Sequence, residues 1–297
     1  MNSNKVLSLK NLSKSFGRVK ANENVNLDLH RSEILALLGE NGAGKTTLMN
    51  MLFGHYIPDS GHVEVADDTG HFAELTLGHP QAAISAGIGM VHQHFTLAEN
   101  LDAVDNIMLG AEPLSRLTRS RSKAEEKIKR LMIKSGLSTP LNVSVGRLTV
   151  GERQRVEILK ALYRNVRILV LDEPTAVLTP QEADTLFENI AAMATDGLAV
   201  IFISHKLREV LAYSHRISIL RLGKNVGEMA TSLANEQKIA RLMVGSETSL
   251  PKRNSALVGG PVLCVESLSV AGRGRRDSLK NVNLTVLSGE ILGIAGV

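Results

Sequence analysis

The sequence predicts an α/β fold, in which a parallel sheet is covered by helices on both of its faces. Two observations support this prediction. Runs of consecutive apolar residues alternate with helical patterns along the chain, which is typical of buried parallel strands joined by helices. In addition, a glycine-rich stretch at residues 39–47 fits the pattern G-x-x-x-x-G-K-[ST] and lies between an apolar run and a helical segment. This arrangement predicts a loop that binds the phosphates of a nucleotide.

The composition is that of a globular protein, with 43% hydrophobic and 22% charged residues among 297. The net charge is only +4 and the basic residues are spread along the chain, so no nucleic-acid partner is expected. The single cysteine, Cys264, excludes an internal disulfide and favours a reducing compartment. No signal peptide begins the chain, and no apolar run reaches the roughly 20 residues that span a bilayer. We therefore expect a soluble protein that is linked to a membrane only through a partner.

The strands are predicted from apolar runs of two kinds. The first two strands, and the one after the turn at residues 58–61, alternate apolar and polar residues as half-buried strands do. The later strands are continuously apolar, as buried central strands are. The last one is followed by a turn at residues 223–225, which predicts a closing hairpin. The predicted strands are residues 6–9, 25–29, 33–38, 62–65, 86–91, 166–171, 198–203 and 216–220.

The helices are predicted from periodicity and capping signals. Residues from about 100 to 163 are predicted to be mostly helical, and the spacing of Ile128, Leu131 and Met132 places these three on one helix face. Residues 179–182, Thr-Pro-Gln-Glu, form a capping box with proline at the first helical position, so a further helix is predicted to begin there.

The glycine-rich loop carries the first part of the predicted site. Its glycines allow a tight turn in which successive backbone N–H groups face one anion. Lys45 is expected to reach the outer phosphates, and the Thr46 hydroxyl to ligate Mg²⁺. The helix predicted to follow at residues 46–52 adds the partial positive charge of its N-terminus. The residues expected to bind nucleotide here are Gly39, Glu40, Asn41, Gly42, Ala43, Gly44, Lys45, Thr46 and Thr47.

Polar residues at the ends of three other predicted strands supply the rest of the site. The carboxyl ends of parallel strands meet at one edge of a sheet, which is where ligands bind. Asp172 is placed to hold Mg²⁺, and Glu173 to polarise an attacking water. His205 is placed to touch the γ-phosphate, and Gln93 to reach both metal and water.

Each of these residues also has a simpler interpretation when it is taken alone. The acidic pair at residues 172–173 is compatible with a turn, His205 with an exposed helix cap, and Phe16 with a core aromatic. His92 and His94 are spaced like a metal pair, but they lack further ligand partners nearby. The order of the polar strand ends after a phosphate loop favours a nucleotide site.

Residues 148–155 resemble the L-S-G-G-Q-x-Q-R signature of ATP-binding-cassette (ABC) ATPases. The residues that match are Leu148, Gly151, Gln154 and Arg155, and those that depart from the signature are Thr149, Val150 and Glu152. Val150 resembles the L-S-V-G form found in ABC importers of simple sugars and nucleosides. Thr149 keeps a hydroxyl that can donate to a phosphate, whereas Glu152 adds a negative charge near that phosphate and weakens the expected catalytic strength.

The resemblance covers residues from 6 to about 244. It implies the P-loop NTPase fold, with a RecA-like parallel sheet, an antiparallel β-subdomain at the start and a helical subdomain at about 97–163. It also implies ATP and Mg²⁺ as cofactors, with Thr46, Gln93 and Asp172 as the metal ligands on the protein.

The same resemblance assigns roles to individual residues. Phe16 matches the aromatic that stacks on adenine, and Gln93 matches the Q-loop glutamine. Glu173 matches the catalytic glutamate and His205 the switch histidine, which makes them the expected catalytic residues. Thr179 stands where the family has its D-loop aspartate. The signature residues, Leu148, Thr149, Val150, Gly151 and Glu152, are expected to act in trans on the ATP of another cassette.

Within the family, residues 91–95, 151–160 and 172–182 resemble the ATPase subunits of nucleoside importers of the basic-membrane-protein type, and sugar importers share much of this pattern. The resemblance implies two transmembrane permease subunits, an extracytoplasmic solute-binding protein as an indirect partner, and a peripheral position on the cytoplasmic face of the membrane. Two alternatives remain, a soluble ABC ATPase acting on ribosomes or DNA, and a P-loop kinase. The short, barely charged linker at residues 246–260 speaks against a ribosome-acting member, and the lack of a long insertion between Lys45 and Asp172 speaks against a DNA-acting one. The signature stretch speaks against a kinase.

The end of the chain repeats its beginning. Residues 281–284 echo residues 24–27, Glu290 echoes Glu33, and Gly296 echoes Gly39, all at the same separation. We therefore expect a first cassette at residues 1–245, a linker at 246–260, and the start of a second, truncated cassette at 261–297. The second cassette would be a further partner of the first.

Overall fold

The computed structural model describes residues 4–67, 69–111, 121–245, 258–270 and 279–295. The chain divides into two compact units, Met1–Glu247 and Thr248–Val297. Most of the linker predicted at residues 246–260 lies outside the described residues, as do residues 112–120 of the predicted helical region. No helix in the described ranges is long and apolar enough to cross a bilayer.

The first unit contains two sheets. The six-stranded sheet has the order β10-β9-β3-β8-β7-β6, in which β3, β8, β7 and β6 are parallel neighbours and β9 runs parallel to β3. The four-stranded sheet is antiparallel, with the order β2-β1-β4-β5. The strands are β1 (Lys5–Phe16), β2 (Val19–His30), β3 (Ile34–Leu38), β4 (Ser60–Ala66), β5 (Phe72–Glu74), β6 (Ile88–Val91), β7 (Ile168–Asp172), β8 (Ala199–Ile203), β9 (Arg216–Arg221) and β10 (Lys224–Ala230).

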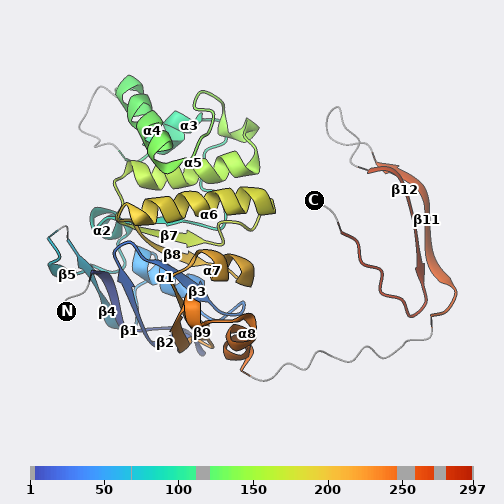
Figure 1. Cartoon of the computed structure of the whole chain (residues 1–297), viewed down its shortest axis with the longest axis horizontal. Coiled ribbons are helices and arrows are strands. Elements are labelled where there is room, and N and C mark those ends of the chain that lie inside the picture. Colours follow the sequence, from blue (N-terminus) through green and yellow to red (C-terminus); the bar gives the residue numbers. More distant parts are fainter. Residues whose placement is uncertain (1–3, 68, 112–120, 246–257, 271–278, 296–297) are drawn as a thin grey trace. The chain divides into compact units, whose positions relative to one another are not determined.

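Helices cover the larger sheet, and Figure 1 shows α6 lying along β7 while α3, α4 and α5 gather beyond it. The described helices of this unit are α1 (Lys45–Phe53), α2 (Pro80–Ser85), α3 (Ala103–Met108), α4 (Arg121–Ser135), α5 (Val150–Tyr163), α6 (Pro180–Thr195), α7 (Leu207–Tyr213) and α8 (Glu236–Val244), with short 3-10 turns at Val145–Arg147 and Thr231–Leu233. The α/β fold with an antiparallel β-subdomain and a helical region is thus confirmed.

Two hydrophobic cores lie on opposite faces of the six-stranded sheet, because successive residues of a strand point to opposite faces. On β3, Ile34, Ala36 and Leu38 belong to the core shared with α3 to α8. Leu35 and Leu37 belong to the core shared with α1, α2 and the antiparallel sheet. All five β3 residues are buried, which explains why the sequence reads as a continuous apolar run.

The predicted elements differ from the observed ones in their bounds and in the short elements that were missed: β1 and β2 are longer than the predicted residues 6–9 and 25–29. The three-residue strand β5 and the six-residue helix α2 have no signal in the sequence analysis. The strand predicted at residues 86–91 begins only at Ile88, because Ala86 caps α2 and Gly87 adopts a φ of 79°. The region predicted to be mostly helical contains α3, α4 and α5, with irregular chain between α4 and α5. The predicted face of α4 is confirmed, since Ile128 is fully buried with Leu131 and Met132 packed beside it.

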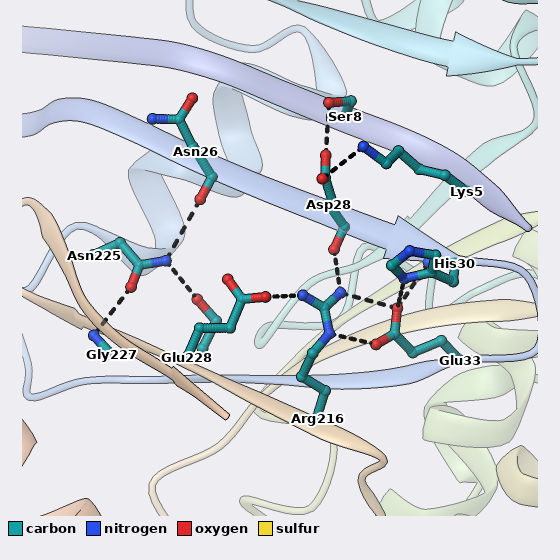
Figure 2. Close-up of polar contacts among 11 residues, drawn as sticks. Lys5, Ser8, Asn26, Asp28, His30, Glu33, Arg216, Asn225, Gly227 and Glu228 are labelled. Carbon is teal, nitrogen blue, oxygen red and sulfur yellow. Dashed lines mark hydrogen bonds and ion pairs between the residues drawn. The ribbon is translucent and has the colours of Figure 1, made fainter. Parts of the chain in front are cut away.

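A charged network joins the two sheets. Figure 2 shows Arg216, at the start of β9, reaching Glu33 before β3. Its Nε and Nη2 lie 2.6 and 3.0 Å from the two carboxylate oxygens of Glu33, and Nη2 also donates to the backbone oxygen of Asp28 on β2. Glu33 in turn accepts the backbone N–H of His30 at 2.7 Å. The bidentate pair of Arg216 and Glu33, together with the bond to Asp28, therefore links the antiparallel β-subdomain to the six-stranded sheet.

The second unit contains an antiparallel hairpin, β11 (Pro261–Val270) and β12 (Leu279–Leu287). Its register repeats that of β1 and β2, so that the pair Cys264–Thr285 corresponds to Ser8–Asp28. The remaining pairs of β11 and β12 correspond to pairs of β1 and β2 at the same separations along the sequence. The Oε2 of Glu290 accepts the N–H of Leu287 at 2.8 Å, as Glu33 accepts that of His30. The repeat seen in the sequence is thus a repeat of local structure.

The repeat stops short of a third strand. Residues 291–295 follow Glu290 but form no strand, whereas Ile34 opens β3 in the first unit. A parallel strand needs neighbours to accept its hydrogen bonds, and the described part of the second unit holds only two strands. Ile291 and Ile294 are accordingly 98% and 85% exposed, while Val282 and Leu284 are partly covered within the hairpin.

Candidate functional site: a phosphate loop and four strand ends

The loop after β3 has a backbone that only glycine adopts easily. Gly39 and Gly44 have φ values of 154° and 99°. A Cβ at Gly39 would lie 2.3 Å from the backbone oxygen of Leu220, and one at Gly44 would lie 2.2 Å from that of Ala21. Gly44 also precedes the first residue of α1. The loop is therefore held tightly between the start of a helix and the neighbouring β9 and β2, as a phosphate-binding loop requires.

Lys45 is folded back into this loop. The residue is only 8% exposed. Its Nζ donates to the backbone oxygens of Gly39 and Glu40 at 2.7 and 2.9 Å. Burial lowers the pKa of Lys45, although Glu173 and Asp172 act in the opposite direction. The ammonium group is thus held over the loop, close to two carboxylates, where an outer phosphate would gain a charged donor.

Asp172, the last residue of β7, lies beside the same loop. Its pKa is raised by burial and by the neighbouring carboxylate of Glu173, while Lys45 and a hydrogen bond with the Thr46 hydroxyl act to lower it. Thr46 and Asp172 therefore lie close together, and both offer oxygen atoms, the ligands that Mg²⁺ prefers. This oxygen set fits a magnesium ion that takes its remaining ligands from nucleotide phosphates and water. The described residues hold no cluster of three His, Cys, Asp or Glu side chains that would form an all-protein metal site.

Glu173 joins the ends of three strands. One carboxylate oxygen lies 3.1 Å from Nδ1 of His205, which follows β8, and the other accepts a hydrogen bond from Nε2 of Gln93, which follows β6, also at 3.1 Å. Glu173 itself has a φ of 47°, in the left-handed region that costs energy for a residue with a Cβ. The structure brings together Gln93, Asp172, Glu173 and His205 at the edge that holds Lys45 and Thr46, as the strand order predicts.

Phe16 lies at the end of β1 and is 45% exposed, so the alternative of a buried core residue is wrong. Its ring packs edge to face against Tyr56, with centroids 5.3 Å apart. The sequence analysis did not predict a role for Tyr56. Its position shortly after the helix that follows the phosphate loop is the only feature of the sequence that could have indicated one. Two exposed aromatic rings in contact with each other form a surface on which a base can stack.

Asn22 is a second residue that the sequence analysis missed. Both polar atoms of its side chain are buried without a hydrogen-bond partner among the described residues. It packs against the phosphate loop, since a Cβ on Gly44 would lie 2.7 Å from its Nδ2. Asn22 precedes the strand predicted at residues 25–29, and nothing in the spacing of the sequence marks it.

The signature residues lie apart from this cluster, at the N-terminus of α5. Leu148 is buried, Gly151 is packed below Glu182, and Val150 is 43% exposed. Thr149 caps α5, and its N–H and hydroxyl both lie within hydrogen-bonding distance of Oε2 of Glu152. Across the ranges that the structure describes, no hydrogen bond or ion pair connects these five residues to the phosphate loop or to Glu173.

A cavity of about 180 Å³ lies behind Gln93, between the sheet and the helical region. Its polar lining includes His92, Thr96 and Glu157, and Glu157 accepts the backbone N–H of Thr96 at 2.5 Å. The His92 ring stacks on His55 with centroids 5.4 Å apart, and burial together with that neighbouring ring lowers the pKa of His92. His92 is thus an aromatic packing partner, and the metal pair with His94 gains no support among the described residues.

The fold and these contacts define a nucleotide-binding cassette of the phosphate-loop class. Residues 22–176 match the model of the ABC transporter family, and the chain belongs to this family. The cassette also superimposes on an ATP-binding cassette of an ABC transporter solved in its ADP conformation, with a TM-score of 0.70 and 24% identity over 82% of this chain and 99% of that one. That likeness supports the fold.

Three relatives extend the comparison to almost the whole chain. A glucose import ATP-binding protein of Haloferax volcanii is 42% identical over 98% of this chain and 57% of its own length. A guanosine import ATP-binding protein of Bacillus subtilis is 39% identical over 98% of this chain and 56% of its own length. A ribose import ATP-binding protein of Burkholderia ambifaria is 40% identical with the same two coverages. The chain thus spans a little over half the length of these three relatives.

Proposed function

We propose that this chain is the ATP-binding and ATP-hydrolysing part of an ABC importer. The observation that carries the proposal is the meeting of Lys45, Thr46, Asp172, Glu173 and His205 at one sheet edge, in a member of this family. Hydrolysis of a nucleoside triphosphate needs a phosphate cradle, a metal site, an oriented water and charge stabilisation. The side chains at this edge offer one group for each need.

The roles follow from the contacts. The loop amides and Lys45 would bind the phosphates, and the exposed Phe16 and Tyr56 would stack on the base. Thr46, Asp172 and Gln93 would hold Mg²⁺, which screens the charge of the phosphate oxygens. Glu173 would orient and deprotonate the attacking water, and His205 would contact the γ-phosphate from beside it.

The signature residues from Leu148 to Glu152 are proposed to act on the nucleotide of another cassette. Their separation from the phosphate loop supports this, because they form no polar contact with it within the described chain. The repeated hairpin of residues 261–287 supports a second cassette in the complete protein, since its register and the Glu290 contact reproduce those of the first. In that view residues 1–245 form the first cassette and residues 246–260 the linker.

The solute is proposed to be a nucleoside or a simple sugar. Relatives of nearly equal identity are named for guanosine import and for sugar import: 39% for the guanosine import protein, 42% for the glucose import protein and 40% for the ribose import protein. We further propose two transmembrane permease subunits and, as an indirect partner, an extracytoplasmic solute-binding protein. The chain would sit on the cytoplasmic face of the membrane, with a permease segment docked at the cavity behind Gln93.

The test is reconstitution of the complete reading frame with its permease subunits in proteoliposomes. ATP hydrolysis that rises when guanosine, ribose or glucose is supplied together with its binding protein would support the proposal and identify the solute class. Recovery of ribosomes instead of permeases in a pull-down, with no solute-dependent hydrolysis, would contradict it.

A further inference from the structure

A buried polar cluster lies directly behind the catalytic edge of the sheet. Thr175, Ser204 and Glu209 are 2%, 3% and 5% exposed. The Oγ1 of Thr175 lies 2.7 and 2.8 Å from the two carboxylate oxygens of Glu209, and the Oγ of Ser204 donates to one of them at 3.1 Å. One carboxylate therefore accepts from hydroxyls on two different loops. We call Thr175, Ser204 and Glu209 the clasp.

Lys206 completes the hydrogen bonding of the clasp. Its Nζ lies 3.3 Å from Oε1 of Glu209 and donates to the backbone oxygen of Thr175 at 2.8 Å. Its backbone N–H donates to the Oγ of Ser204 at 3.0 Å. A buried polar network in which every member has partners is rigid, and removing one member leaves the others unsatisfied at a cost of about 1–3 kcal/mol each. The clasp is therefore expected to hold the segments that carry Thr175 and Ser204 rigidly in place.

The two loops that the clasp holds are the ones that carry the catalytic pair. Thr175 comes two residues after Glu173, and Ser204 immediately precedes His205. The loop after β7 needs such an anchor, because Glu173 has a φ of 47° and a strained backbone persists only where its surroundings hold it. The backbone N–H of Glu173 also donates to the oxygen of Ile203, the last residue of β8, at 3.0 Å, so the loop after β7 is joined to the end of β8 as well.

We propose that Glu209 is a positioning residue for nucleotide hydrolysis, which sets the separation of Glu173 and His205 through Thr175 and Ser204. The inference rests on the proposed function, because the separation matters for turnover only if Glu173 and His205 act on ATP. Glu209 reaches the reaction only through the two loops, whereas Glu173 and His205 form the exposed contact. Loss of the carboxylate would let the two loops move apart without altering the phosphate loop.

The first experiment measures the contact itself. The ring nitrogen resonances of His205 are recorded by NMR in the complete protein, in wild type and in the Glu209→Ala and Glu209→Gln variants. Glutamine keeps the shape and one hydroxyl acceptor, so we expect a large shift of the His205 Nδ1 resonance in the alanine variant and an intermediate one in the glutamine variant. Glu236→Gln is the matched control, since Glu236 is also in the first turn of a helix but is exposed.

The second experiment measures turnover. We expect kcat to fall by about 10²-fold in Glu209→Ala, the loss that follows an error of about 1 Å in the placement of catalytic groups, with the Kd for ATP unchanged and a smaller fall in Glu209→Gln. In a His205→Ala background the further effect of Glu209→Gln should be much smaller, because the contact it positions is gone. Purely structural damage would lower turnover equally in both backgrounds.

The two experiments separate this inference from the proposed function. If the wild-type protein hydrolyses no ATP, the proposed function fails while the NMR shifts still report on the clasp. If both variants fold and leave the His205 resonances unchanged, or if Glu209→Gln lowers kcat equally with and without His205, Glu209 is not a positioning residue. Should Glu209→Ala fail to fold, Glu209→Gln decides both measurements.

Discussion

The carboxylate of Glu173 lies 3.1 Å from Nδ1 of His205, although 32 residues separate the two in the chain. They meet because β7 and β8 are parallel neighbours, with Asp172 paired to Ile203 at their carboxyl ends. Glu173, the first residue after β7, and His205, the second residue after β8, therefore lie at the same edge of the sheet. The site is thus a consequence of strand order more than of any local motif.

Glu173→Gln tests the role of that carboxylate. Glutamine keeps the size of the side chain and can still bond Gln93 and His205, but it cannot accept a proton from water. We expect ATP binding to survive and hydrolysis to fall by about 10²-fold or more, as for loss of a general base. The measurement is phosphate release by the assembled transporter, and turnover near the wild-type rate would show that Glu173 is not the base.

Lys45→Ala tests the phosphate loop. The variant removes the ammonium group that lies over the backbone oxygens of Gly39 and Glu40, so an outer phosphate loses a charged donor. We expect the affinity for Mg·ATP to fall by about 10²-fold, since a hydrogen bond to a charged group contributes up to about 3 kcal/mol. A fluorescent ATP analogue measures this at equilibrium. Lys238→Ala, which removes an exposed lysine from α8, is the matched control and should leave affinity unchanged.

Glu33→Gln tests the joint between the sheets through its pH dependence. Burial acts to raise the pKa of Glu33, but the hydrogen bonds from Arg216 and His30 outweigh it and hold the pKa below its ordinary value. Such a group stabilises the fold fully above the unfolded pKa, and this contribution is lost as the pH falls through the lower folded pKa. We therefore expect Glu33→Gln to lower the free energy of unfolding by about 3 kcal/mol near neutral pH, as for breaking a buried pair.

The same experiment has an internal check in its pH profile. The difference in unfolding free energy between wild type and Glu33→Gln should shrink as the pH falls from the ordinary glutamate range through the lowered pKa of Glu33, because the wild-type carboxyl then becomes protonated. Urea denaturation across this range measures it. Glu126→Gln is the control, because Glu126 pairs with Arg130 on an exposed helix surface and should cost at most about 0.5 kcal/mol. A difference that is independent of pH would show that the Glu33 carboxylate is not the source of the stability.

A cysteine crosslink tests the proposed docking face. In a Cys264→Ser background, His94→Cys places a thiol on the exposed chain beside the cavity behind Gln93, and Lys224→Cys places one on the exposed β9–β10 turn. We expect a permease loop to crosslink to position 94 and not to position 224. The reverse result would move the docking face to the hairpin near Gly223.

Sequence analysis predicted the parts of this fold that local patterns encode. The tight glycine turn after β3, the apolar runs of β3, β7 and β8, and the capping box at Thr179 were all confirmed, because each depends on neighbouring residues. The clasp residue Glu209 and the pair of Arg216 with Glu33 could not be predicted. They are side-chain contacts between segments that are distant in the sequence. Neither the period of hydrophobic residues nor a capping pattern indicates which distant side chains will meet. Phe16 is intermediate: the sequence left its burial open, and its exposed contact with Tyr56 appears only when β1 and the end of α1 come together.

The last prediction concerns the signature in trans. Thr149 caps α5 and, like the rest of the signature, makes no polar contact with the phosphate loop in the part of the chain that the structure describes. If each nucleotide needs the loop of one cassette and the signature of another, hydrolysis by the 297-residue chain requires two copies paired head to tail. We expect its specific activity to be very low at high dilution and to rise with protein concentration, in step with dimer formation measured by sedimentation.

Mixing two inactive variants makes this test independent of absolute rates. Lys45→Ala removes the phosphate contact, and Thr149→Asp keeps a good N-cap for α5 while it places a carboxylate where a phosphate would approach. In a mixed head-to-tail pair, the loop of the second variant faces the intact signature of the first, so one complete site forms. We therefore expect each variant alone to be inactive and the mixture to recover a substantial fraction of wild-type hydrolysis. A mixture that stays inactive, together with wild-type specific activity that is high and constant in a species shown to be monomeric, would mean that the signature does not act across two cassettes.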